Sequence, residues 1–304
     1  FGAVSGSTQA TVVAVGGPLR PRTLKAGYND SFALALIVNS SDIAFLIPPS
    51  IGMIIYGVVS STSIAELFIA GIGPGLLILL LFSIYAYIYA VRNNVPTEPK
   101  ATWRQRLQTM RAALWPMGFP VIIIGGIYGG IFTATEAAAV CLSLAVLIGV
   151  LQRKLTLTSI WEAFRETCLQ TASIFFIAAG AKIFVAFVAL TGVAPAIVDV
   201  VTQAELSVFW LLLSIALIYL LLGMFLDPIG IMVLTLPLVV PLVETYGMDL
   251  IWFGVVIIKL LEIGLITPPV GLNVFVIANV VGKDAPIDRI FAGIARFLSV
   301  DVIV

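Results

Sequence analysis

Apolar residues in this chain form long runs separated by short polar stretches, a pattern typical of helices that cross a bilayer. A bilayer-spanning helix needs roughly 20 predominantly apolar residues, and the run at 68–91 meets that length. The other apolar runs that we interpret as spans or half-spans are 31–47, 51–60, 116–131, 135–151, 171–191, 207–222 with a limb continuing to 242, and 251–281. The pattern therefore predicts an all-α polytopic membrane protein.

Two of these runs are interrupted by adjacent prolines, at Pro48-Pro49 and at Pro268-Pro269. Proline removes a backbone donor and biases the preceding residue away from helical geometry, so each run is predicted to be a broken helix. In lipid, unpaired backbone groups are tolerated only where protein or a water-filled cavity covers them. A broken helix at membrane depth is therefore more often a ligand site than a defect.

The two breaks belong to an internal repeat with an offset of 220 residues, which is the separation of Pro48 and Pro268. The offset holds without gaps over some thirty residues and pairs a glycine, an acid and an aromatic residue. The matched pairs are Gly27 with Gly247, Asn29 with Asp249, Phe32 with Trp252, Ile37 with Ile257, Asp42 with Glu262 and Ile43 with Ile263. Broken segments at corresponding places in two halves of a chain indicate the binding site of a secondary transporter.

Composition supports the membrane assignment and excludes several classes of function. Of the 304 residues, 61% are hydrophobic and 11% are charged, with a net charge of +0 and a mean hydropathy of +1.14. No basic face is available for nucleic acid, and two cysteines are too few for a disulfide framework or a metal cluster. The sequence has no histidine, which excludes zinc hydrolases and a serine protease built on Val4-Ser5-Gly6. It also has no Walker-type phosphate loop, so ATP is not consumed in this chain. We expect no catalytic residues and no cofactor.

The distribution of basic residues predicts the orientation of the loops. Segments 17–30, 92–115 and 152–168 are rich in Arg and Lys and are placed in the cytoplasm, the last as an amphipathic helix at the interface. Segments 60–67, 193–206 and 243–250 carry acids without bases and are placed outside. The loops before the two broken helices then lie on opposite sides, which makes the repeat an inverted one, as alternating access requires.

Each repeat also has a predicted re-entrant hairpin tip of small or oxygen-bearing residues. These are Gly2, Ser5, Gly6, Ser7 and Thr8 in the first repeat, and Gly223, Asp227 and Pro228 in the second. A tip next to a break would gather carbonyl and side-chain oxygens for Na⁺, and half-helix N-termini would offer N–H groups to a carboxylate. The alternative is that the small residues only allow helices to pack closely.

Three ionisable residues near the breaks have open roles. Asp227 is predicted to bind a cation or cap the tip, because ionisable residues in an apolar context are costly and usually functional. The alternative is a simple helix cap. Lys259 and Glu262, spaced i and i+3, either pair with each other, or Lys259 contacts an anionic substrate.

The motifs FGAVSGST, LIPPSIGMIIYG, FTATEAAAV, GMFLDP, YGMDLIWFGV and EIGLITPPVGLNVF occur in this order. With them the chain resembles the large membrane subunit of a tripartite ATP-independent periplasmic (TRAP) transporter over essentially all its residues. The resemblance implies an inverted-repeat, elevator-type ion-transporter fold and Na⁺-coupled import of an organic acid such as a C4-dicarboxylate or sialic acid. It also implies two partners, a small membrane subunit and a periplasmic substrate-binding protein, and a multi-pass location in a bacterial or archaeal inner membrane.

The resemblance further implies site residues at the matching positions. The Na⁺ sites would involve Ser5, Gly6, Ser7, Pro48 and Ser50 in repeat one, and Gly223, Asp227, Thr267 and Gly271 in repeat two. Substrate-binding candidates are Asn273, Thr8 and Lys259. The segment Ser40–Ala44 departs from the family, because many members have a glycine-rich run there.

The expected organisation has four parts. Residues 1–60 and 207–281 form the two transport-domain repeats, 61–206 form connecting scaffold helices with a loop at 92–115, and 282–304 form a truncated C-terminal helix. We expect the sequence to be the larger, C-terminal part of a longer protein. Alternatives to a Na⁺-driven importer are an ion channel or passive pore, a Na⁺/carboxylate symporter that needs no binding protein, and a scaffold subunit without a transport site.

Overall fold

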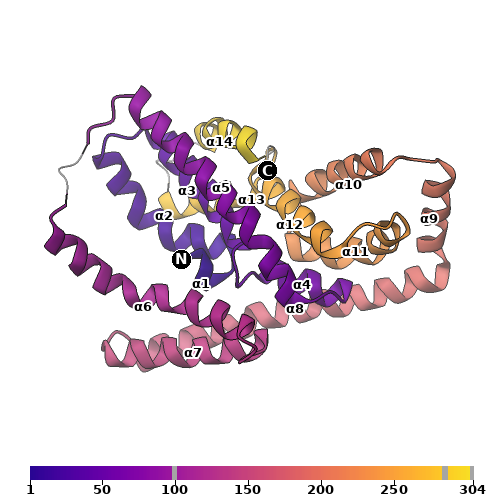
Figure 1. Ribbon diagram of the computed structural model, residues 1–304, viewed down its shortest axis with the longest axis horizontal. Helices are drawn as coiled ribbons and strands as arrows, with labels where there is room; N and C mark the ends of the chain where they lie inside the picture. Colours follow the sequence, from indigo (N-terminus) through magenta and orange to yellow (C-terminus); the bar gives the residue numbers. More distant parts are fainter. Residues whose placement is uncertain (98–100, 283–286, 302–304) are drawn as a thin grey trace.

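The computed structural model describes residues 1–97, 101–282 and 287–301, and the secondary structure of these residues is entirely helical (Figure 1). The first repeat and the helix that follows it comprise α1 (Gly2–Ser5), α2 (Thr8–Lys25), α3 (Asp30–Asp42), the 3₁₀ turn η1 (Ile43–Phe45), α4 (Ile51–Ser60) and α5 (Ile64–Arg92). The connecting helices are α6 (Trp103–Tyr128), α7 (Ala134–Leu151), α8 (Leu157–Thr191) and α9 (Val193–Gln203). The second repeat and the last helix comprise α10 (Val208–Gly223), α11 (Pro228–Thr245), α12 (Leu250–Ile266), α13 (Leu272–Val281) and α14 (Ile287–Asp301).

Four helices within the described ranges are long and apolar enough to cross a membrane by length and composition. They are α5, α7, α11 and the part of α8 from Leu157 to Phe184. Together with the shorter apolar helices α4, α10 and α13, they confirm the prediction of an all-α polytopic membrane protein.

Most helices begin where the sequence offers a side-chain oxygen to the first free backbone donors. Ser7, Ser50, Asp227 and Asp249 each accept a hydrogen bond from a backbone N–H in the first turn of α2, α4, α11 and α12 respectively. Such caps satisfy donors that have no partner within the helix. The chain can therefore interrupt a helix at membrane depth and restart it within a few residues.

The internal repeat is confirmed in the secondary structure. Helix α11 begins and ends 220 residues after α2, and α12 begins 220 residues after α3. Both proline pairs lie in the interruption of a helix, and both Pro-Pro peptide bonds are cis. The equivalence inferred from letters in the sequence thus extends to the start and end of helices.

The two broken helices lie beside each other and run in opposite directions. Near the end of the first, the Tyr56 hydroxyl in α4 donates to the Leu250 carbonyl at the start of α12, at 2.6 Å. At the opposite end, the Ser31 hydroxyl at the start of α3 donates to the Arg289 carbonyl of α14, which follows the end of the second broken helix. Each hairpin limb also packs on the other repeat, α2 against α13 and α11 against α4. This reciprocal packing is what an inverted repeat predicts.

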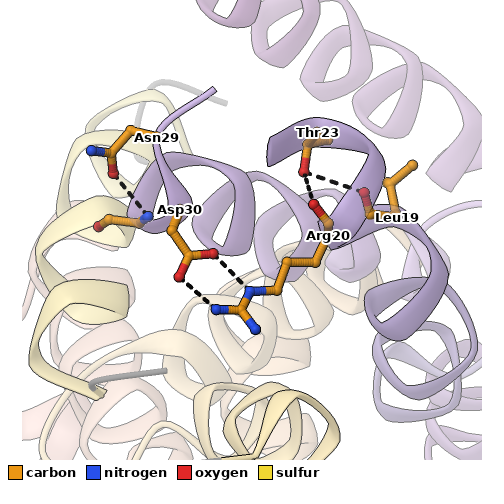
Figure 2. A network of polar contacts seen from close by, with 6 residues as sticks. Leu19, Arg20, Thr23, Asn29 and Asp30 are labelled. Carbon is orange, nitrogen blue, oxygen red and sulfur yellow. Dashed lines mark hydrogen bonds and ion pairs between the residues drawn. The ribbon is translucent and has the colours of Figure 1, made fainter. Parts of the chain in front are cut away.

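The turn between α2 and α3 is fixed by polar contacts (Figure 2). The Arg20 guanidinium donates to both carboxylate oxygens of Asp30, with both distances 2.7 Å, and the Asn29 side chain accepts from the Ser31 N–H. The start of α3 next to this turn contributes Phe32 to an aromatic cluster with Tyr89 of α5 and Phe297 of α14. The buried core is drawn from both repeats, α5 and α14.

Several sequence-based boundaries were wrong. Segment 17–30 is not a loop, because α2 continues through Pro18 and Pro21 to Lys25. Helix α6 begins at Trp103, inside the loop predicted at 92–115.

The connecting region also differs from its prediction. The predicted interfacial helix at 152–168 and the span at 171–191 are one continuous helix, α8, and most of segment 193–206 is the helix α9. Figure 1 shows α8 running along one side of the molecule to α9, which leads back to α10. In the C-terminal part, the structure describes α14 from Ile287 to Asp301, while residues 283–286 and 302–304 lie outside the described ranges.

Candidate functional site

The first hairpin tip contacts the first helix break, as predicted. The Gly6 carbonyl accepts a hydrogen bond from the N–H of Ile51, at 3.2 Å. Gly6 has a left-handed backbone, with φ of 61°, and a Cβ on this residue would lie 2.5 Å from the Pro49 carbonyl oxygen. Only glycine fits both the backbone conformation and the close approach.

Side-chain oxygens surround this contact. Ser5 Oγ lies 3.0 Å from Thr11 Oγ1 and donates to the Ser7 carbonyl at 3.2 Å. Ser7 caps α2, and the fully buried Ser50 caps α4. The structure therefore brings Ser5, Gly6, Ser7 and Ser50 to one place with the Pro48-Pro49 break.

Thr8 stands out within this group. Its side chain is fully buried, and its hydroxyl oxygen has no hydrogen-bond partner among the described residues. A buried polar group without a partner costs free energy, on the order of 1–3 kcal/mol. The orphaned hydroxyl at the predicted tip is a feature expected of a ligand position.

The second hairpin tip packs on the helix that precedes the second break. Gly223 at the end of α10 packs directly on Gly264 of α12, and a Cβ on Gly264 would lie 2.7 Å from the Gly223 Cα. Thr267 Oγ1 donates to the Ile263 carbonyl, and Gly271 begins α13 with φ of 61° and no side-chain cap. Asp227 is exposed and caps α11 by accepting from the Ile229 N–H at 3.0 Å. The structure thus brings Gly223 to the helix that precedes the break, whereas Asp227 caps the neighbouring hairpin limb.

The substrate candidates are Thr8, already placed at the first tip, Asn273 and Lys259. Asn273 is fully buried, and its Nδ2 donates to Asp42 Oδ1 at 2.8 Å. Lys259 makes the predicted contact with Glu262, at 3.5 Å between Nζ and Oε2, but it lies closer to Asp301, at 2.6 Å between Nζ and Oδ1.

Two of the residues that contact the substrate candidates, Asp42 and Asp301, were not predicted to take part in the site. Asp42 entered the sequence argument only as the repeat equivalent of Glu262, and Asp301 did not enter it. The repeat equivalence with Glu262 was a signal that could have placed Asp42 in the interior, because equivalent residues of two repeats are expected in equivalent surroundings. Asp301 lies 42 residues after Lys259, and no local spacing rule links them.

Comparison with protein families identifies the chain. The family model "Tripartite ATP-independent periplasmic transporter, DctM component" matches residues 1–304. The large permease UehC of the ectoine/5-hydroxyectoine TRAP transporter of Ruegeria pomeroyi is 57% identical over 90% of this chain and 64% of its own length. The large permease TeaC of the ectoine TRAP transporter of Halomonas elongata is 54% identical over 90% of this chain and 65% of its own length.

More distant relatives carry other substrate names. The large permease SiaM of the sialic acid TRAP transporter of Vibrio cholerae is 36% identical over 98% of this chain and 70% of its own length. The present chain spans a little under two thirds of the length of the two ectoine relatives. The match over the whole chain and these identities show that the chain belongs to the DctM-component family of TRAP transporters, the family of their large membrane permease subunits.

Proposed function

We propose that the chain is the main part of the large permease subunit of a Na⁺-coupled importer that takes up a small carboxylate-bearing solute by an elevator mechanism. The transporter would act in a bacterial or archaeal inner membrane with a small membrane subunit and a periplasmic substrate-binding protein. The observation that carries this proposal is the contact between the first hairpin tip and the first break, which brings Ser5, Ser7 and Ser50 together. The buried, orphaned hydroxyl of Thr8 belongs to the same tip.

Na⁺ coupling is supported by the chemistry of this tip. Hydroxyl and carbonyl oxygens are the ligands that hard cations prefer, and a bound cation would supply the partner that the Thr8 hydroxyl lacks. This role for Thr8 replaces the sequence-based expectation that it binds substrate. The end of a half-helix adds negative partial charge at such a position. We infer that the first coupling ion binds at the tip of repeat one, and that Thr267 and Gly271 serve the equivalent break in repeat two.

The substrate is proposed to be ectoine or a related zwitterionic solute. The relatives named for ectoine are 57% and 54% identical, whereas relatives named for C4-dicarboxylates and sialic acid are 37% and 36% identical. Ectoine carries a carboxylate, which agrees with the predicted acid. The N-terminus of α13 has no side-chain cap, and the N–H groups of Leu272 and Asn273 are the ones proposed to bind the carboxylate.

Uptake by the complete transporter in proteoliposomes tests this proposal. With the binding protein present, labelled ectoine should accumulate under an inward Na⁺ gradient and not when choline or K⁺ replaces Na⁺. Accumulation that persists without Na⁺ would contradict the coupling. Fast, unsaturated flux without the binding protein would favour a passive pore, and saturable Na⁺-driven uptake without it would favour a simple symporter.

A single substitution tests whether the Thr8 hydroxyl binds an ion or only contributes to packing. Thr8→Val removes the orphaned hydroxyl with little change in shape, so the protein should be as stable as the wild type or more stable in choline. Uptake should need an Na⁺ concentration at least about tenfold higher, which corresponds to about 1.4 kcal/mol. Thr23→Val near the end of the same helix, where the hydroxyl bonds to backbone carbonyls, is the matched control and should leave the Na⁺ dependence unchanged.

A further inference from the structure

Four buried oxygens on the two broken helices have no hydrogen-bond partner in the described part of the chain. They are Asp42 Oδ2, Glu262 Oε1, Asn273 Oδ1 and Asn39 Oδ1. Their residues are 3%, 1%, 0% and 1% exposed, respectively. Buried polar atoms nearly always have partners, so four orphaned acceptors in one region require an explanation.

These residues belong to one group on the two broken helices. Asn273 of α13 is hydrogen-bonded to Asp42 of α3 at 2.8 Å, and α3 contacts α12, the helix that carries Glu262. Asn39 precedes Asp42 by three residues and so lies on the same face of α3. Asp42 and Glu262 are repeat equivalents, as are Asn39 and Lys259. The group therefore lies where the two repeats meet.

The charges of the group do not balance. Asp42, Glu262 and Asp301 carry three potential negative charges, and Lys259 carries one positive charge. Lys259 Nζ contacts Asp301 Oδ1 at 2.6 Å and Glu262 Oε2 at 3.5 Å. The one side-chain hydrogen-bond partner of Asp42 in the described structure is the neutral amide of Asn273, and the single positive charge of Lys259 is shared among all three acids. A buried anion without a compensating charge costs several kcal/mol, so the arrangement calls for a positive partner.

We propose that Asp42, Glu262 and Asn273, with Asn39 beside them, form a second kind of cation site that binds Na⁺ or an ion of similar size. One proton in the group would satisfy at most two of the four orphaned oxygens, whereas one cation coordinates several oxygens together. The described residues contain no cluster of three or more His, Cys, Asp or Glu side chains able to hold a metal ion, so the two carboxylates would share the ion with amide oxygens. Two carboxylates with amide oxygens are a donor set for a hard cation.

This site differs from the one proposed at the hairpin tip in its ligands and its consequence. It uses side chains of α3, α12 and α13, and none of the tip residues Ser5 to Thr8. An ion here would hold both broken helices together, so its binding should stabilise the contact between the repeats. Removing the ion would leave like charges facing each other across that contact.

Direct counting of bound Na⁺ tests the proposal without any need for transport. The complete purified transporter would be equilibrated with ²²Na⁺, with choline chloride holding the ionic strength constant. Asp42→Asn and Glu262→Gln, both close in shape to the wild type, should each bind one Na⁺ fewer per protein. Asp249→Asn is the matched control, because Asp249 is an exposed cap at the start of α12 and asparagine caps helices equally well. It should bind as many ions as the wild type.

The combination with the tip variant distinguishes the two sites. Asp42→Asn together with Thr8→Val should lose two bound ions, and each single variant should lose one. If both acid variants bind as many ions as the wild type, the interior site does not exist, whatever becomes of Na⁺-coupled transport. An unchanged ion count with a new pH dependence of melting would equally overturn it and assign the group to a proton.

A measurement on the unmodified protein covers the case in which the variants fail to fold. Hydrogen exchange would be compared in Na⁺ and in choline for peptides covering 36–42 and 257–262, which contain Asp42 and Glu262. The site predicts slower exchange of these amides in Na⁺, by about tenfold for an ion present at ten times its dissociation constant. Equal exchange in both salts would refute the proposal.

Discussion

Replacement of Gly6 by alanine should separate the first hairpin tip from the first break. Gly6 is left-handed, with φ of 61°, and its added Cβ would lie 2.5 Å from the Pro49 carbonyl oxygen. A left-handed backbone costs a residue with a Cβ roughly 1–2 kcal/mol. Ordinary contact begins at 3.4 Å, so the two segments must also move apart by about 0.9 Å.

That movement would break a specific interaction. The Gly6 carbonyl accepts from the Ile51 N–H at 3.2 Å, and a shift of this size takes the bond beyond hydrogen-bonding distance. Loss of the bond adds about 1 kcal/mol, giving a total of about 2–3 kcal/mol. Because 1.4 kcal/mol corresponds to a factor of ten, the population with tip and break in contact should fall at least about thirtyfold.

The assay compares Gly6→Ala with Gly247→Ala in the complete transporter. Gly247 has almost the same backbone, with φ of 68°, but open space around its Cβ position, so the control carries the left-handed cost alone. We expect Gly6→Ala to melt at a lower temperature than the control and to lose most Na⁺-dependent uptake, while the control retains it. Equal melting temperatures and equal uptake in the two variants would refute the argument that the tip must touch the break.

Three further changes test the packing of the repeats. Gly264→Ala places a Cβ 2.7 Å from the Gly223 Cα and should lower the melting temperature. The control is Gly230→Ala, at a helical position with open space, which should leave the melting temperature unchanged or raise it. Equal effects of the two variants would contradict the close approach of α10 and α12. Tyr56→Phe removes the hydroxyl that joins α4 to Leu250 and should destabilise the protein by about 1 kcal/mol in a denaturant titration; no loss would mean that this contact does not hold the repeats together. The partly exposed ion pair of Arg20 with Asp30 should contribute no more than about 1 kcal/mol to stability in a double-mutant cycle, and less at high salt. A larger or salt-independent coupling energy would show that solvent screening does not limit the strength of this pair.

The features that could be predicted from the sequence are those set by local chemistry or by the repeat. Two proline pairs fix the positions of the breaks because proline cannot donate to a helix. The 220-residue offset then predicts the start of α12 from that of α3 without any knowledge of packing. The contact between Gly6 and the first break was likewise inferable, since a hairpin tip and a break that are repeated together tend to meet.

The features that could not be predicted depend on contacts between distant segments. Segment 17–25 has the composition of a loop, with Pro18 and Pro21, yet it is helical. Helix α13 packs on this limb, and a Cβ on Gly16 would clash with the Ile277 Cδ1. The pairing of Lys259 with Asp301 similarly needs α14 to lie beside α12. Hydropathy predicts that such a lysine will be buried with a partner, but it does not predict which acid.

The packing also bears on which helices move together if the transporter works as an elevator. Helix α5 was assigned to the scaffold because it follows the first repeat, but its glycines face that repeat. A Cβ on Gly71 would lie 2.5 Å from the Leu46 carbonyl, and one on Gly75 would lie 3.0 Å from Ile47, both next to the first break. So close a contact cannot slide without opening the break, and we therefore expect α5 to move with the two repeats.

Distances between spin labels would test this expectation. Labels would replace Leu77 in α5, Leu234 in α11 and Leu147 in α7, all of which are exposed. The distance between positions 77 and 234 should stay constant when substrate and Na⁺ are added, whereas that between 77 and 147 should change. The physical reason is that α5 shares a buried core with both repeats, while none of the described residues of α7 enters that core. A change between 77 and 234 would place the moving boundary before α5, at the start of the connecting region that the sequence predicts.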